Sequence, residues 1–226
     1  EIGAQVAEKK RTDSPVPFLL NLKFKFFDTL VFKKIKKELG GNLEFLPCGG
    51  AMLKKEIAEF FAAIGLPVIV GYGLTETTAT VTALPTKNPV YGSVGIPLPG
   101  VYIKIGAEDE ILVKYGGVMK GYYKNEEETE KVFTEDGYFK TGDAGRIDEN
   151  GNLFIVDRIK DLMKTSNGKY IAPQTIEIPL QSHPEISQAM VIAEGKPYVS
   201  AVIVPDFETL IEKYQGFKNY VSLTIE

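Results

Sequence analysis

The chain contains 226 residues, 44% of them hydrophobic and 25% charged, a balance typical of a packed globular protein that excludes intrinsic disorder. The net charge of −4 excludes nucleic acid as the main partner. No apolar run reaches the length of a membrane span, no signal peptide opens the sequence, and the single cysteine, Cys48, points to a reducing compartment. We therefore expect a cytoplasmic protein.

The first 17 residues are polar, contain two prolines and show no period, so we expect an irregular segment. Residues 18–39 mix apolar side chains with six lysines, and the apolar spacing predicts a helix that ends at Gly40-Gly41. The apolar positions are Leu30, Val31, Ile35 and Leu39. A helix that packs on the core with its lysines in solvent is the favoured interpretation. The alternative is a helix lying on a membrane surface, which would make the protein peripheral.

A strand–helix–strand pattern comes next. Leu43–Pro47 and Pro67–Val70 read as buried strands, and Leu53–Ile64 between them is a strongly amphipathic helix. This is a βαβ unit, which predicts a parallel sheet with a right-handed crossover. Ligands bind beyond the carboxyl ends of such strands, where Gly49–Ala51 and Gly71–Glu76 lie.

Short strands then replace this pattern, at residues 101–105, 110–114 and 152–157. Asn125 caps a short helix, and Glu128 three residues later completes a capping box. We expect an antiparallel, barrel-like subdomain.

A third region begins near Lys160. Asn167-Gly168 predicts a hairpin, Pro173 opens a helix, and Pro179 breaks it. The remaining expected elements are strands at 188–193 and 198–204 and a helix capped by Asp206. The fold class is therefore α/β: a parallel βαβ element with a small antiparallel β-barrel in residues 1–158, followed by a small, incomplete α+β domain in residues 159–226.

The segment Gly71–Thr78 carries the strongest chemical signal. Glycines at the end of a buried strand let a flat ligand approach the backbone, while hydroxyls and a carboxylate suit phosphate and Mg²⁺. From the residues alone, a nucleotide site and a merely tight turn both remain open.

This segment resembles the Tyr-Gly-x-Thr-Glu signature of adenylate-forming enzymes, which comprise acyl-CoA synthetases, luciferases and the adenylation domains of peptide synthetases. Three further stretches are similar to motifs of that family in the same order: Gly49–Ala51, Tyr138–Asp143 and Asp157–Asp161. Gly92–Pro97, Gly121–Tyr123, Lys164 and Gly168–Tyr170 also fit. The resemblance covers about residues 29–210, and the ordered set is far more specific than any one motif.

The resemblance implies a role for each matching residue. The implied contacts to nucleotide and CoA are Gly49, Gly50, Ala51, Gly71, Tyr72, Gly73, Asp143, Arg158 and Gly168. Tyr72 would flank adenine, Thr75 would bind phosphate, and Glu76 would hold Mg²⁺ on the ATP phosphates. Asp143 would accept hydrogen bonds from the ribose hydroxyls.

The remaining implied roles belong to residues at and after the start of the mobile carboxyl-terminal domain. Arg158 would donate to ribose or phosphate, Lys160 would be the hinge of the mobile domain, and Gly168 would face the pantetheine channel. Alone, Asp143 would read as a turn or capping residue, Arg158 as half of a surface ion pair, and Lys160 as an ordinary exposed lysine. Membership of the ordered set favours the functional interpretation.

Other reactive residues receive structural interpretations. His183 is expected at the surface and Cys48 in packing, and no Cys/His cluster predicts a metal site. The family's phosphate-binding loop and catalytic lysine have no counterpart in this sequence, and residues 215–226 fall outside the resemblance. We therefore expect the chain by itself not to make an adenylate.

The pattern is most similar to bacterial long-chain fatty-acyl-CoA synthetases, on the Thr-Glu-Thr-Thr form and the run Ala193–Ala201. The implied substrates are ATP with Mg²⁺, a fatty acid or other carboxylate, and CoA. The alternatives are another acyl- or aryl-CoA ligase, an adenylation domain that loads a carrier protein, and a non-catalytic nucleotide-binding module. Acyl chain length and oligomeric state are not encoded in these motifs.

Overall fold

The computed structural model describes residues 1–214, and the chain divides into two compact units, residues 1–155 and residues from 156 onward. The expected domain boundary after residue 158 stays a prediction.

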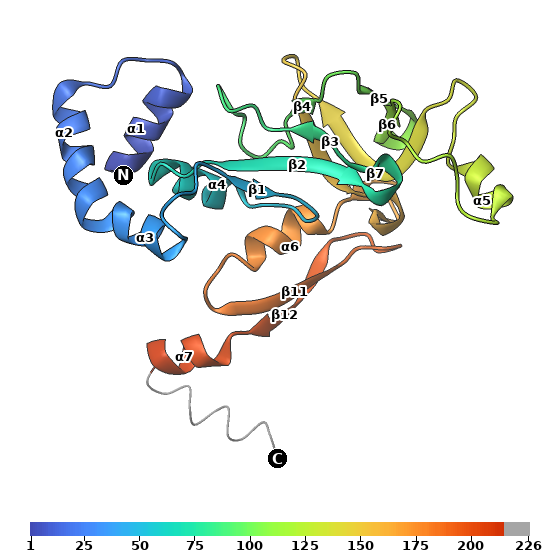
Figure 1. Ribbon diagram of the computed structural model, residues 1–226. Coiled ribbons are helices and arrows are strands. Elements are labelled where there is room, and N and C mark those ends of the chain that lie inside the picture. The colour runs from blue at the N-terminus through green and yellow to red at the C-terminus, as the bar shows by residue number, and fades with distance from the viewer. Residues whose placement is uncertain (215–226) are drawn as a thin grey trace. The chain divides into compact units, whose positions relative to one another are not determined.

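The amino-terminal segment is helical, contrary to the irregular lead-in expected from its sequence. The chain opens with α1 (Ile2–Arg11), α2 (Phe18–Phe27), one π-helical turn η1 (Asp28–Phe32) and α3 (Lys33–Glu38) (Figure 1). Val6 of α1 is only 1% exposed, and a Cβ on Gly3 would lie 2.4 Å from the carbonyl oxygen of Ala63. Packing against α4 (Lys55–Ala63) therefore stabilises α1, although its sequence has no helical repeat of apolar residues.

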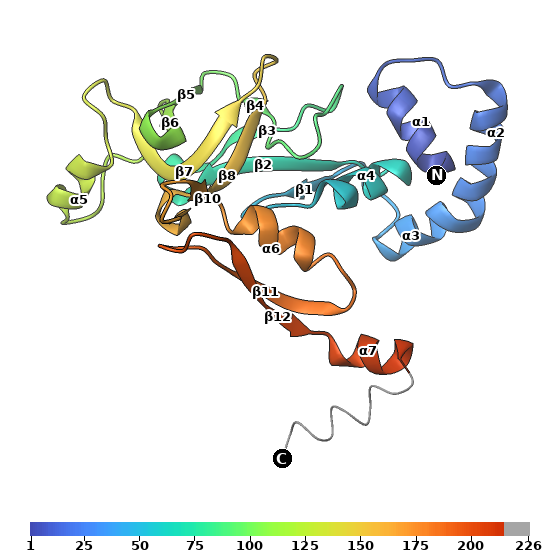
Figure 2. The same ribbon diagram turned by 180° about the vertical axis from the view of Figure 1, so that it is seen from behind.

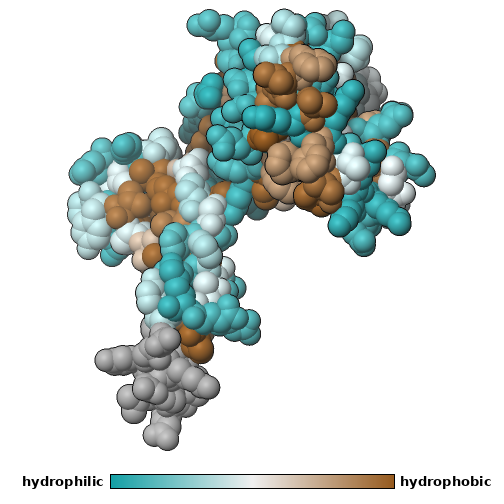
Figure 3. Space-filling view, turned by 90° about the vertical axis from the view of Figure 1, so that its left-hand side faces the viewer, coloured by the Kyte–Doolittle hydropathy of each residue, from teal (hydrophilic) through white to brown (hydrophobic). Residues whose placement is uncertain are grey.

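The lysine-rich helices do not show the core packing that was favoured from the sequence. No residue of α2, η1 or α3 is buried among the residues that the structure describes. Phe18 and Phe26 are 79% and 62% exposed. Figure 3, seen from the side of α2, shows apolar side chains at the surface between polar ones. Within residues 1–214, no helix has the length and apolarity needed to cross a bilayer.

The first sheet has the order β1 (Leu46–Cys48), β2 (Val68–Leu74), β3 (Ala79–Ala83) and β4 (Ile96–Pro97). β1 and β2 are parallel and joined through α4, which confirms the βαβ unit. β3 and β4 add antiparallel pairs, so the sheet is mixed rather than purely parallel. Val68, Val70 and Leu84 form its core, because alternate residues of β2 face inward.

The second sheet has the order β5 (Tyr102–Ile105), β6 (Glu110–Lys114), β7 (Phe139–Ile147) and β8 (Leu153–Arg158). The β5–β6 and β6–β7 pairs are antiparallel, as expected. The linear order leaves β5 and β8 at the edges of a curled, half-barrel sheet, which confirms the expected barrel-like subdomain. The longest strand, β7, was recognised in the sequence only as a motif (Figure 2).

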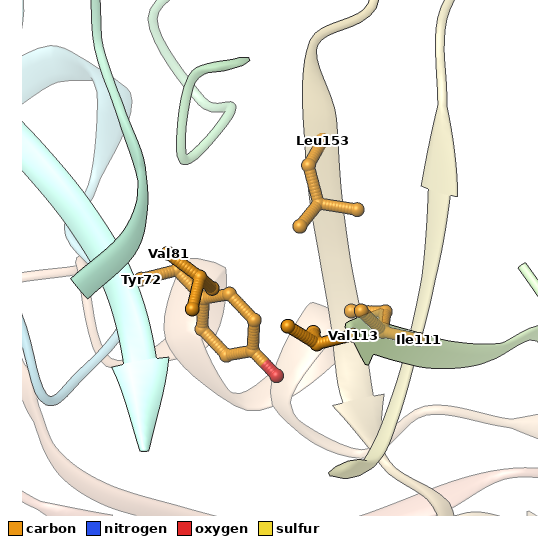
Figure 4. Packing of buried hydrophobic residues seen from close by; sticks show 5 residues of the cluster. All are labelled: Tyr72, Val81, Ile111, Val113 and Leu153. Carbon is orange, nitrogen blue, oxygen red and sulfur yellow. The ribbon is translucent and has the colours of Figure 1, made fainter. Parts of the chain in front are cut away.

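One hydrophobic cluster joins the two sheets. Its buried members are Tyr72, Val81, Ile111, Val113 and Leu153. Figure 4 shows the Tyr72 ring extending from β2 toward the residues of β6. Nearby, η3 (Ala107–Asp109) precedes β6, and α5 (Glu126–Lys131) begins where Asn125 Oδ1 accepts the Glu128 N–H at 3.3 Å. Asn125 caps α5 as predicted, but its own N–H donates to the carbonyl oxygen of Tyr122 at 3.2 Å instead of to Glu128, so the expected capping box does not form.

The second unit is α+β. After η4 (Ile159–Asp161) come β9 (Met163–Lys164), β10 (Tyr170–Ile171), α6 (Gln174–Leu180), β11 (Ile186–Ile192), β12 (Ser200–Pro205) and α7 (Phe207–Lys213). The β9–β10 hairpin is antiparallel, as predicted, and β11 and β12, which were expected only as strands, form a second antiparallel pair. α6 ends one residue after Pro179, and Asp206 caps α7 by accepting the Thr209 N–H at 2.8 Å.

Candidate functional site

The two predicted glycine segments meet where β1 ends beside the middle of β2, because β2 continues to Leu74 and not only to Val70 as expected. The parallel register pairs Cys48 with Val70, which places Gly49 beside Gly71. A Cβ on Gly49 would lie 3.2 Å from the carbonyl oxygen of Gly71. Gly50 has a φ of +85° and open space around it, so a glycine here keeps the backbone accessible. Ala51 follows, exposed, at the same edge.

The signature segment forms a hairpin and not a simple loop. Its glycines complete β2, Thr75–Thr77 form a 3₁₀ turn (η2), and the chain returns as β3. The β2–β3 register shifts between Tyr72 and Gly73. At that point a Cβ on Gly73 would lie 1.7 Å from the carbonyl oxygen of Ala79. Gly73 is therefore required by the close approach of two strands, independently of any ligand.

Tyr72 and Asp143 are brought into direct contact. The Tyr72 hydroxyl donates to Asp143 Oδ2 at 2.6 Å, and the two residues are 8% and 6% exposed. The Tyr72 ring belongs to the cluster between the sheets (Figure 4). Tyr72 thus supports the carboxylate from the core side, while the expected contact of its ring with adenine stays a prediction.

The main chain around Asp143 is fixed to β6. Thr141 Oγ1 donates to the carbonyl oxygen of Ile111 at 2.8 Å and accepts the Asp143 N–H at 3.1 Å. The Gly142 N–H donates to Glu110 Oε1 at 3.0 Å. Sequence reasoning named neither Thr141 nor Glu110 individually as a support. The only sequence signal for these supports was the threonine of the Thr-Gly-Asp motif, which is Thr141.

The η2 turn presents Thr75 to solvent and holds Glu76 half-buried. Glu76 Oε1 accepts the Tyr122 hydroxyl at 3.1 Å. Thr77, which sequence reasoning passed over, is fully buried, accepts the Leu74 N–H at 2.8 Å and donates to the carbonyl oxygen of Ala79 at 3.0 Å. Thr77 therefore organises the turn that carries Thr75 and Glu76.

Tyr122 is a persistent hydrogen-bond donor. Partial burial, followed by the hydrogen bond to Glu76 and the negative charges of Glu76 and Glu128, raises the pKa of Tyr122 above its usual value. The phenol therefore stays protonated well above neutral pH and keeps donating to the carboxylate.

Arg158, Lys160 and Gly168 belong to the second unit, whereas Asp143 belongs to the first. The buried Asp157 accepts the Arg158 N–H at 2.8 Å and the first N–H of α6, from Gln174, at 3.2 Å. Asp157 thus ties the segment before the predicted hinge to α6, a role that the sequence did not indicate. Lys160 is exposed at the centre of η4.

Gly168 occupies the turn of the β9–β10 hairpin. Its φ is +79° with nothing near its Cβ position, and its N–H donates to the carbonyl oxygen of Thr165 at 2.9 Å. The predicted hairpin is confirmed, and the proximity of Gly168 to CoA stays a prediction.

The donor set of the first unit fits ATP with Mg²⁺. The unit offers accessible glycine backbone at Gly50, a buried carboxylate, Asp143, and a half-buried carboxylate, Glu76. Carboxylate oxygen is a ligand that Mg²⁺ prefers, and the ion commonly takes its remaining ligands from phosphates and water. No group of three or more His, Cys, Asp or Glu side chains in residues 1–214 forms a complete cage. Glu76 would therefore be one ligand in a shell completed by nucleotide and water.

Comparison with models of protein families shows which family the chain belongs to. A family model described as AMP-binding enzyme matches residues 14–123, and one described as AMP-binding enzyme C-terminal domain matches residues 160–226. The chain belongs to this adenylate-forming family. The second match includes residues 215–226, which corrects the expectation that they fall outside the resemblance. Those residues lie beyond the described part of the structure.

The individual relatives are acyl-CoA ligases. The chain is 41% identical over 206 residues to the long-chain-fatty-acid–CoA ligase FadD15 of Mycobacterium bovis, covering 91% of this chain and 34% of the relative. It is 38% identical to long-chain-fatty-acid–CoA ligase 1 of Saccharomyces cerevisiae, covering 80% of this chain and 28% of the relative. The chain thus spans about a third of the length of the curated relatives that it matches.

Solved structures agree on the fold. O-succinylbenzoate CoA synthetase of Bacillus subtilis, in complex with ATP and magnesium, aligns with a TM-score of 0.65 at 30% identity over 77% of this chain and 40% of that one. ATP-bound MatB of Rhodopseudomonas palustris aligns with a TM-score of 0.65 at 34% identity over 80% of this chain and 39% of that one.

Proposed function

We propose that this chain is part of an ATP-dependent ligase that joins long-chain fatty acids to CoA. In the first half-reaction the carboxylate attacks the α-phosphorus of ATP, forming acyl-AMP and releasing pyrophosphate. In the second, the CoA thiol attacks the acyl carbon, and AMP leaves as the thiol gives up its proton. The adenylate supplies the leaving group that a free carboxylate lacks.

The observation that carries this proposal is the Tyr72–Asp143 hydrogen bond beside the glycine edge of the first sheet. It orders the Asp143 carboxylate, whose acceptor oxygens suit the ribose hydroxyls that the resemblance assigns to this residue. Thr75 would donate to phosphate. Glu76 would hold Mg²⁺, which when bound neutralises phosphate charge.

Arg158, Lys160 and Gly168 would act from the second unit. Arg158 adds a charged donor toward the nucleotide, Lys160 serves as the hinge, and Gly168 contacts CoA after the movement. The exposure of Arg158 and Lys160 is compatible with these roles.

The proposal that the substrate is a fatty acid rests on the similarity of this chain to its relatives. The ligases named for long-chain fatty acids are 41% and 38% identical to this chain, whereas the aligned structures, which include O-succinylbenzoate CoA synthetase and MatB, are 30% and 34% identical. We further propose that the parent protein is cytoplasmic and makes peripheral contact with a membrane.

The test compares different carboxylic acids as substrates of both half-reactions, in the protein that carries this chain. ATP–pyrophosphate exchange and acyl-CoA formation are measured with palmitate, octanoate, malonate and an o-succinylbenzoate-type aromatic acid. We expect palmitate to give the highest kcat/KM in both assays. A preference for malonate or the aromatic acid would assign another acyl-CoA ligase, exchange without transfer to CoA would favour carrier-protein loading, and no exchange with any acid would favour a non-catalytic module.

A further inference from the structure

The signature turn is held by a second segment of the same unit, residues 115–122, which connects β6 to α5. Hydrogen bonds from this 115–122 loop reach three successive residues of the turn. They join Tyr115 Oη to the carbonyl oxygen of Thr77, Thr78 Oγ1 to that of Gly117 at 2.5 Å, the Met119 N–H to that of Glu76 at 2.7 Å, and Tyr122 Oη to Glu76 Oε1 at 3.1 Å. Three of these bonds fix the turn by its main chain or by Thr78. Only the bond from Tyr122 acts on the Glu76 carboxylate.

The main chain of Tyr122 is itself fixed. Gly121 before it has a φ of +154°, and a Cβ there would lie 2.6 Å from Thr129 Cγ2, so glycine is required. The Tyr122 N–H donates to Thr129 Oγ1 at 2.9 Å, and Thr129 Oγ1 donates to the carbonyl oxygen of Asn125 at 2.8 Å. The first turns of α5 therefore set the position from which the phenol reaches Glu76.

The bond leaves the carboxylate half engaged. No other hydrogen bond reaches the Glu76 carboxylate from the residues that the structure describes. Tyr122 thus holds one carboxylate oxygen, and no hydrogen bond from the described residues reaches the other. Because a glutamate side chain loses rotamer freedom when it is ordered, fixing it before the cation arrives removes part of the cost of binding.

We propose that Tyr122 is a positioning residue for the metal site: its hydroxyl fixes the Glu76 carboxylate in the orientation that meets Mg²⁺ on the ATP phosphates. This inference rests on the proposed function, which gives Glu76 the role of metal ligand. Tyr122 acts only through Glu76 and touches neither nucleotide nor acid.

The test measures binding in the protein that carries this chain. The dissociation constant of ATP is determined by calorimetry without acid substrate, once with saturating Mg²⁺ and once with excess EDTA, and the ratio is the gain from the metal. Tyr122→Phe keeps the ring and removes the hydroxyl. We expect it to reduce the gain about three- to tenfold, the value of one partly exposed hydrogen bond to a charged group, with ATP affinity in EDTA unchanged.

Two variants make the result interpretable. Tyr123→Phe removes the hydroxyl of the neighbouring, 88% exposed tyrosine and should match the wild type. Glu76→Gln should reduce the gain at least as much as Tyr122→Phe.

Each other outcome overturns the inference in a distinguishable way. If Glu76→Gln reduces the gain and Tyr122→Phe does not, the hydrogen bond has no positioning role, and the assignment of Glu76 stands. If Tyr122→Phe weakens ATP binding equally in EDTA, its role is structural. If Glu76→Gln leaves the gain unchanged, the metal assignment within the proposed function fails, and this inference fails with it.

Discussion

Asp143 is a carboxylate that is 6% exposed and yet well satisfied. A buried charge is costly unless it is hydrogen-bonded, and a charge-assisted bond of 2.6 Å from Tyr72 is of the strong kind. Thr141 fixes the main chain of the same residue at 3.1 Å. Hydrogen bonds from several groups thus hold this one acidic residue in place, which is the arrangement expected of a ligand-binding residue.

The first residue-scale prediction concerns Asp143→Ala. If Asp143 binds the ribose hydroxyls, its loss should weaken ATP affinity about ten- to hundredfold, because hydrogen bonds to a charged acceptor contribute about 1.5–3 kcal/mol. Equilibrium titration with ATP in the parent protein measures the effect. Unchanged ATP affinity and turnover would remove the assignment.

Tyr72→Phe separates ribose binding from support of the carboxylate. This variant removes the 2.6 Å bond but keeps Asp143 itself. We expect a smaller loss of ATP affinity than in Asp143→Ala. Equal losses would indicate that both substitutions act by disturbing the packing between the sheets.

At the scale of elements, the β2–β3 hairpin is specified by a steric requirement. The two strands approach so closely at the register shift that Gly73 has no room for a side chain. The obstruction is the backbone of Ala79, which cannot rotate away as a side chain would. The hairpin therefore fixes the η2 turn at its base, while the 115–122 loop holds it from the side.

Gly73→Ala should accordingly destabilise the first unit by about 3 kcal/mol, at the upper end of the usual cost of overpacking. Gly116→Ala is the matched control, because nothing lies within 4 Å of the Cβ position of Gly116. We expect the control to stay within about 0.5 kcal/mol of the wild type, as surface substitutions do. Urea unfolding of the parent protein measures both, and similar midpoints for the two variants would contradict the steric argument.

At the scale of the whole molecule, the chain passes between its two units within β8, and η4 follows directly. Asp157 bonds to α6, so the segment before Lys160 is tied to an element that follows it in the same unit. Lys160 is exposed in η4, and its role as the hinge stays a prediction that would require this bond to break.

Lys160→Pro should separate the half-reactions in the parent protein. Proline fixes φ near −65° and restricts Ile159, which suits one pose of the chain and prevents rotation to another. We expect pyrophosphate exchange to persist and acyl transfer to CoA to be lost, by single-turnover measurement of each step. Lys160→Ala, which keeps backbone freedom, should retain both. Equal loss of both steps in Lys160→Pro with unchanged circular dichroism would point to a direct catalytic role, and no loss of either would refute the hinge.

Local signals predicted most of the elements. The βαβ unit followed from apolar runs separated by an amphipathic helix, the α5 and α7 caps from Asn125 and Asp206, and the β9–β10 hairpin from Asn167-Gly168. Each depends on residues within a few positions of one another, so one sequence suffices. The order of the family motifs likewise indicated the adenylate-forming class before any contact was known.

The tertiary structure alone decided the rest. α1 forms because Gly3 and Val6 pack on α4, and β7 was hidden because a Thr-Gly-Asp motif carries no alternating pattern. The supports of the site join positions far apart in the chain, as Tyr72 joins Asp143 and Tyr122 joins Glu76. Periodicity and motif spacing describe neighbours in sequence, whereas a hydrogen bond across two strands depends on register and packing. The sequence therefore determined which residues carry the chemistry, and the tertiary structure determined which residues hold them in place.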